Sequence, residues 1–186
     1  MRHWGMIGIL ALAACAATPE PEPKEPPLTG TITLGSGPCA GLCAVYTMTL
    51  YADDTYLLNA EDNTIKPGRS RGSLPVNSFR RAVEALEQYE LNTFQRFYVP
   101  TEKANCPQAI SGLPITDFSR VDDDNDIRVF VTFNTGCVNF ADRDRLDQLN
   151  ERLRDIFRVK ELISVGEPPR PPRPETAAPV QGLGGL

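Results

Sequence analysis

Four cysteines in the middle of the chain are the residues whose spacing bears most directly on chemistry: Cys39, Cys43, Cys106 and Cys137. Thiols can act as a redox pair, bind zinc or form disulfides. Redox sites use Cys-x-x-Cys at a helix start and structural zinc sites use paired Cys-x-x-Cys knuckles, so Cys-x-x-x-Cys ahead of a predicted strand fits neither. An even count predicts two disulfides. We favour Cys39–Cys43 with Cys106–Cys137, the second adding about 3–4 kcal/mol, and the other two pairings stay open.

A run of acidic side chains, Asp122-Asp123-Asp124-Asn125-Asp126, is the second candidate. Carboxylates at alternate positions, here Asp122, Asp124 and Asp126, can surround a calcium ion. An EF-hand loop that began at Asp122 would need glycine at its sixth position and glutamate at its twelfth, where this chain has Ile127 and Phe133. We therefore interpret the run as a solvated hairpin tip and keep its three alternate aspartates as the candidate metal ligands.

Two further charged pairs are possible binding or catalytic groups. Glycoside hydrolysis needs two carboxylates that flank a sugar bond, and Asp53 and Asp54 are adjacent acids. Neighbouring residues in a strand point to opposite faces, so we interpret this pair as a turn. Arg69 and Arg71 share one face of a predicted strand and could bind an anion, although a solvated sheet edge also explains them.

The absence of histidine after the first few residues excludes several activities. The only histidine is His3, in a segment that we expect to be removed. The mature protein then has no Ser-His-Asp or Cys-His catalysis, no histidine-bound zinc and no histidine proton shuttle. We assign no catalytic residue and expect no cofactor.

The first fifteen residues predict an exported lipoprotein. A basic start is followed by a short apolar run that is too short to span a bilayer. The run ends in Leu12-Ala13-Ala14-Cys15, which resembles a lipobox, the pattern cleaved just before a cysteine whose sulfur carries diacylglycerol. Several acyl chains anchor a protein stably. Ala16 follows instead of aspartate, which in lipoproteins that this segment resembles favours the outer membrane, facing the periplasm.

Composition divides the chain into four parts: a signal peptide (1–14), a lipid-anchored Pro/Glu tether (15–28), a globular domain (29–165) and a disordered Pro-rich tail (166–186). At about 3.1 Å per residue, the tether would hold the domain roughly 30–40 Å from the lipid. Without residues 1–14 the chain has 18 lysines and arginines against 24 acidic residues, a formal charge of −6. This balance argues against nucleic acid as a partner.

Hydrophobic periodicity predicts an α+β fold, in which two amphipathic helices pack on one face of a small antiparallel sheet stapled by disulfides. The expected strands and helices follow the order β-β-β, α, β-β, α. The strands are expected at 29–34, 44–51, 55–60, 127–133 and 137–140, and the helices at 76–89 and 142–157, while 69–74 could add a short edge strand. We expect Asp142 to cap the second helix.

One segment resembles a known family. The sequence Cys39-Ala40-Gly41-Leu42-Cys43-Ala44-Val45-Tyr46, followed by a hairpin, is similar to a bacterial family of domains of unknown function with a Cys-x-Gly-x-Cys-x-x-Tyr motif. Its members are often secreted or lipid-anchored. The resemblance continues through Pro75 and the Leu113–Asp117 segment to the last helix, and covers about 120 residues. Ala44 replaces the usual proline. The resemblance implies an α+β fold and a location outside the cytoplasm. It does not indicate an activity.

Taken together, these observations predict a membrane-anchored envelope lipoprotein whose domain is a non-catalytic binding or scaffold module. Its partners would be the membrane, through the N-terminal lipid, and an envelope protein or the cell wall. The alternative is a carboxylate-dependent hydrolase of cell-envelope glycans, which would need two acids in one cleft.

Overall fold

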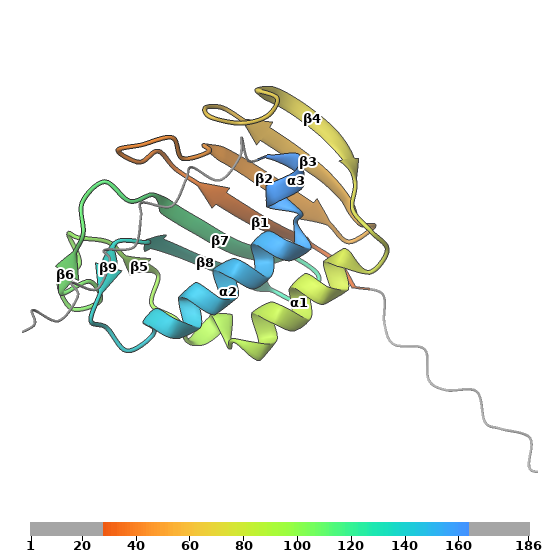
Figure 1. Cartoon of the computed structure of the whole chain (residues 1–186). Helices are drawn as coiled ribbons and strands as arrows, with labels where there is room; N and C mark the ends of the chain where they lie inside the picture. Colours follow the sequence, from red (N-terminus) through yellow and green to blue (C-terminus); the bar gives the residue numbers. More distant parts are fainter. Residues whose placement is uncertain (1–27, 164–186) are drawn as a thin grey trace, which may run out of the picture.

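Alternating apolar and polar residues build the central strands of a seven-stranded sheet (Figure 1), in a computed structural model that describes residues 28–163. In β2 the side chains of Tyr46, Met48 and Leu50 lie on one face and are buried. The strand order is β4 (Gly68–Ser73), β3 (Thr55–Ala60), β2 (Tyr46–Tyr51), β1 (Thr31–Ser36), β7 (Ile115–Asp122), β8 (Ile127–Asn134) and β5 (Phe97–Tyr98).

The predicted fold class is wrong in its architecture. The sheet is large and mixed instead of small and antiparallel, because β5 runs parallel to β8 while the other neighbours are antiparallel. The described residues contain more strand than helix, with three short α-helices and one 3-10 turn. These are α1 (Ser78–Gln88), η1 (Leu91–Thr93), α2 (Arg143–Ile156) and α3 (Val159–Leu162).

Strand β7 is one source of this error, because no strand was predicted for its residues. Its core-facing positions are Thr116, Phe118, Arg120 and Asp122, so only one of the four is apolar. A strand whose buried face is polar lacks the period-two hydrophobic signal. The strand nevertheless forms, because β1 and β8 pair with it along its length.

The helices and one face of the sheet enclose the hydrophobic core. The helices α1 and α2 lie side by side across this face (Figure 1). The apolar side of each helix is buried, with Phe79 and Leu86 on α1 and Leu146 and Leu153 on α2. We call the face beneath them the inner face and the opposite side the outer face. None of the described helices is long and apolar enough to cross a membrane.

Two local expectations are also corrected. Asp142 precedes α2 but makes no capping hydrogen bond with its side chain; its Oδ2 instead accepts a hydrogen bond of 2.6 Å from the buried Tyr98 hydroxyl. The strand at Cys137 does not extend the main sheet. It forms β9 (Cys137–Val138), which pairs with β6 (Gln108–Ala109) in a separate two-stranded sheet.

Candidate functional site

The outer face is open to solvent, since no described helix covers it (Figure 1). Its middle carries small hydroxyl side chains. The register places Thr33 of β1 beside Thr49 of β2 and Ser119 of β7, and the two threonine hydroxyls are 3.2 Å apart. A flat surface of this kind can meet an extended partner without deep pockets.

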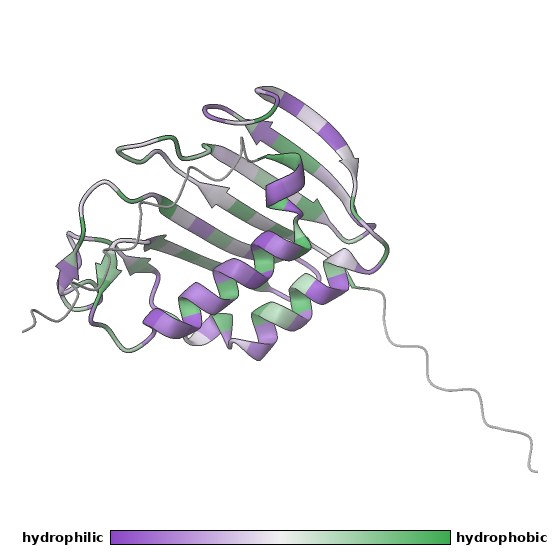
Figure 2. Cartoon of the chain, viewed as in Figure 1, coloured by the Kyte–Doolittle hydropathy of each residue, from purple (hydrophilic) through white to green (hydrophobic). Residues whose placement is uncertain are grey.

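Cationic side chains stand along one edge of this face, on β4. Arg69 lies opposite Asn59 and Arg71 lies opposite Leu57, so both arginines point to the outer face. Both are exposed, and neither has a hydrogen bond or ion pair within residues 28–163. Figure 2 shows β4 as a strand without hydrophobic residues. This strand is an edge of the sheet, so its outward backbone groups are also open to a partner.

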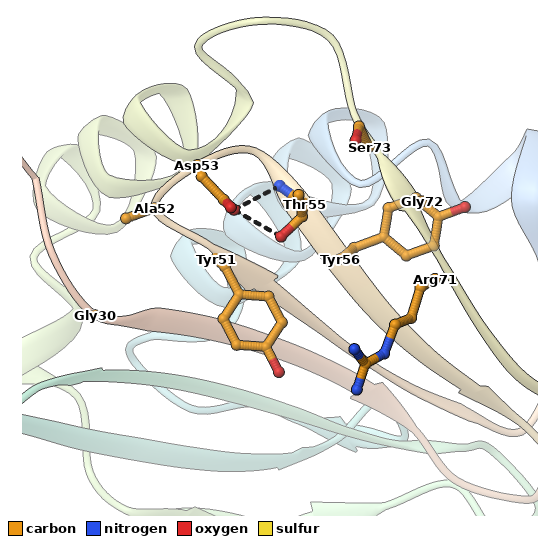
Figure 3. Close-up of a pocket in the computed structure, with 9 residues that line it drawn as sticks. All are labelled: Gly30, Tyr51, Ala52, Asp53, Thr55, Tyr56, Arg71, Gly72 and Ser73. Atoms are coloured by element: carbon orange, nitrogen blue, oxygen red, sulfur yellow. Dashed lines mark hydrogen bonds between the residues drawn. The ribbon is translucent and has the colours of Figure 1, made fainter.

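A broad depression of about 850 Å³ lies at the end of β2, β3 and β4 (Figure 3). The ring of Tyr51 and the guanidinium of Arg71 approach the same space from two strands (Figure 3). A second depression of about 320 Å³ lies beside Leu57 and shares Arg71. Arg71 therefore stands between two hollows. The larger one is lined by Gly30, Tyr51, Ala52, Asp53, Thr55, Tyr56, Arg71, Gly72 and Ser73.

Gly72 shapes one wall of this depression by leaving room for an aromatic ring. A Cβ atom added at Gly72 would lie 2.6 Å from the Tyr56 hydroxyl oxygen, which is far inside van der Waals contact. The ring of Tyr56 therefore depends on glycine at the opposite position in β4.

The adjacent acids Asp53 and Asp54 are used by the turn between β2 and β3. Asp53 accepts hydrogen bonds from the Thr55 hydroxyl (2.6 Å) and amide (3.0 Å), which lower the pKa of its carboxyl. Asp54 accepts from the amides of Asn77 and Phe79, both at 2.7 Å, and so satisfies the free N–H groups at the start of α1. Both acids therefore lie in a turn, as predicted, and Asp54 also caps the helix α1, which begins more than twenty residues later.

An aromatic cluster marks the opposite edge of the outer face. Phe97 on β5 and Phe130 on β8 are 43% and 46% exposed. The guanidinium carbon of Arg96 lies 5.4 Å from the centre of the Phe97 ring and 5.9 Å from that of Phe130. Exposed aromatics beside an arginine are typical of interaction surfaces.

The family described as domain of unknown function DUF6438 matches residues 30–157. The chain belongs to this family. The match spans the sheet from β1 and ends just after α2. No curated protein matches the chain.

All four cysteines of the DUF6438 domain form disulfides, Cys39–Cys43 and Cys106–Cys137, which is the pairing favoured from the sequence. The second bond is fully buried and joins the loop after β5 to β9. The first closes an exposed loop with Leu42, 76% exposed, at its tip. With the sulfurs paired, none is a thiolate available for zinc or redox chemistry.

The acidic run of the DUF6438 domain does not assemble into a metal site. Asp122 is buried and accepts hydrogen bonds of 2.8 Å from Asn125 and from Thr29; the Asn125 bond is the main cause of its lowered pKa. Asp124 and Asp126 are exposed in the turn. Among residues 28–163 no group of three or more acidic, cysteine or histidine side chains could hold a metal ion. The interpretation as a solvated tip fits residues 123–126 but not Asp122.

Sequence reasoning named Arg69 and Arg71 but missed the other members of this surface. Phe130 could have been found, because it breaks the polar side of an alternating strand with a large apolar group. Arg96 and Phe97 carry no such signal, since β5 is only two residues long. The predicted lipidation site Cys15, the predicted signal peptide, residues 15–27 of the predicted tether and the predicted tail lie outside the described residues.

Proposed function

We propose that this protein is an envelope lipoprotein whose DUF6438 domain binds an acidic segment of another envelope protein, without catalysis, on the outer face of its sheet. The observation that carries the proposal is the pair of arginines on β4, which are exposed and unpaired within the described residues. Exposed cations on a domain of net negative charge select for an anionic partner.

The size of the outer face favours a protein over a small ligand. The six longer strands of the sheet, about 4.8 Å apart and about 20 Å long, cover roughly 600 Å² in projection. A standard protein interface buries about 800 Å² on each side. The aromatic cluster of Phe97 and Phe130 adds apolar contact at one edge, while the arginines provide charge at the other.

The edge strand β4 suits an extended partner. A peptide that adds to a sheet edge gains backbone hydrogen bonds, and its side chains read the neighbouring pockets. Arg69 and Arg71 would attract an acidic strand there and repel β4 of a second copy, because like charges would then lie opposite each other.

The proposal of a lipid anchor depends on the sequence that ends at Cys15. The tether would keep the domain within a few tens of ångströms of the lipid, so the partner would be a protein of the same compartment. The hydrolase alternative gains no support from Asp53 and Asp54. Both carboxylates have structural roles, Asp53 in the turn and Asp54 at the start of α1, and the lowered pKa of Asp53 is opposite to what a general acid requires.

Photo-crosslinking in cells tests the binding proposal. A photoreactive amino acid at Thr49, in the middle of the outer face, should form specific adducts, whereas one at Glu151 on the exposed side of α2 should not. The double variant Arg69→Glu/Arg71→Glu should abolish the adducts, and the control Arg152→Glu should leave them unchanged. Equal adducts from both faces, or adducts with purified cell wall alone, would contradict the proposal.

Metabolic labelling tests the anchor separately. Wild-type protein should incorporate labelled palmitate and sediment with membranes, and Cys15→Ser should lose the label. An unlabelled wild-type chain that still begins at Met1 would refute the anchor but would leave the crosslinking result standing.

A further inference from the structure

A separate cavity lies on the inner side of the sheet, away from the two depressions described above. It has a volume of about 470 Å³ and is bounded by the end of α1, by η1 and by the hairpin of β7 and β8. Small-molecule sites are typically 300–1,000 Å³ and mostly apolar with few polar groups. Its apolar wall consists of Leu86, Leu91, Ile127 and Val129.

One side chain of this cavity is charged although its position on the sheet faces the hydrophobic core. Arg120 occupies an inner-face position of β7, with Ile32 on one side and Val129 on the other. Only 12% of its side chain is exposed. Placing a guanidinium in such a position is costly unless its charge and its N–H groups are satisfied.

The structure satisfies Arg120 only in part. Its Nη1 lies 3.1 Å from a carboxylate oxygen of Glu87, but the Glu87 side chain is 64% exposed, so water weakens this ion pair. The Nε of Arg120 is buried and has no hydrogen-bond partner. Other charges near the cavity have partners of their own, Arg128 with Asp123 and Glu90 with Arg145. Asp122, two residues along β7, is close enough for the charge of Arg120 to contribute to its lowered pKa, but its hydrogen bonds come from Thr29 and Asn125. Asp126 is exposed to solvent.

We propose that this cavity binds a small molecule with one carboxylate on an apolar body, and that Arg120 holds the carboxylate. A carboxylate accepts two hydrogen bonds from one guanidinium, which a single exposed glutamate does not provide here. The four aliphatic walls would bury the apolar body. In the free protein Glu87 competes with the ligand for the same cation.

Octanoate is the probe for the test, with octan-1-ol and octylammonium as neutral and cationic controls of the same chain length. In methyl-labelled full-length protein, octanoate should cause saturable NMR shifts in the methyl groups of the four wall residues. Arg120→Gln should weaken binding about tenfold or more, since it removes a charge-assisted pair. Glu87→Gln should strengthen binding several-fold, and Glu84→Gln, on an exposed face of α1, should leave it unchanged.

If Arg120→Gln does not fold, the Glu87→Gln variant is the deciding test, because Glu87 is exposed and a glutamine in its place can still accept a hydrogen bond from Arg120. The proposal is overturned if Glu87→Gln leaves octanoate affinity unchanged or lowers it. It is equally overturned if octan-1-ol or octylammonium binds as tightly as octanoate, or if the shifts occur at the exposed Leu113 and Ile115 instead.

Discussion

The two faces of one sheet are built from different chemistry. On the inner face Ile32, Met48 and Phe133 are fully buried beneath the helices, whereas the outer face has threonines in its middle and arginines at its edge. Burial of apolar area stabilises the first, and nothing within the described residues covers the second. The fold therefore depends on one face and leaves the other available for recognition.

The largest expected effect on stability comes from comparing two phenylalanines of the same strand, one on each face of the sheet. In β8, Phe133 is fully buried and Phe130 is 46% exposed. Phe133→Ala should lower the free energy of unfolding by about 3–5 kcal/mol, because it removes a core ring and leaves a cavity. Phe130→Ala should lower it by about 1 kcal/mol or less. Urea denaturation measures both, and equal losses would show that the outer face is also part of the core.

A smaller effect is expected where the helical layer is attached to the sheet. Asp54→Ala removes the carboxylate that accepts the amides of Asn77 and Phe79 at the start of α1. We expect a loss of about 1–2 kcal/mol, as for other lost helix caps. The control is Asp53→Ala, which breaks only bonds within the turn. A loss at Asp53 as large as that at Asp54 would contradict the attachment role.

The buried carboxylate on β7 should make stability depend on pH. The pKa of Asp122 is lowered in the folded protein, so its contribution is present above the ordinary aspartate pKa and is lost as the pH falls through the folded value. Asp122→Asn should therefore destabilise the protein at pH 7 and converge with wild type near pH 2–3. We expect less than for Asp54→Ala, since both donors, Thr29 and Asn125, are side chains just beyond the ends of β1 and β7. Parallel pH profiles would exclude this role.

The smallest expected effect belongs to the outer face itself. Arg69→Glu/Arg71→Glu should change the free energy of unfolding by no more than about 0.5 kcal/mol, because both side chains are exposed and unpaired in the described part of the chain. Thermal unfolding checks this alongside the crosslinking experiment. A marked loss of stability would mean that the arginines support the fold instead of a partner.

Strands and helices with a strong period were predictable, and those without it were not. The hairpin of β2 and β3, the strand β8 and both long helices follow directly from apolar spacing. Strand β7 was not predicted because its buried face carries the polar residues Thr116, Arg120 and Asp122. Strand β5 is too short for any pattern, and it alone makes the sheet mixed.

The candidate site, too, was predictable only in part. Arg69 and Arg71 could be placed on one strand face from their spacing, since side chains alternate in any strand. Their distance from Tyr51, and the approach of Arg96 to Phe97 and Phe130, depend on which strands become neighbours. Strand order is a property of long-range pairing and cannot be read from local periodicity.

The sequence alone indicated the disulfide-forming cysteines, the lack of histidine after His3, the segment ending at Cys15 that resembles a lipobox, and the amphipathic helices, because each depends on residue type or on spacing within a few turns. Tertiary structure decided that seven strands share one sheet, that Asp54 caps a helix more than twenty residues away, and that Arg120 lies among apolar neighbours. The physical reason is that these features arise from contacts between segments far apart in the chain, whose free energy no short stretch of sequence contains.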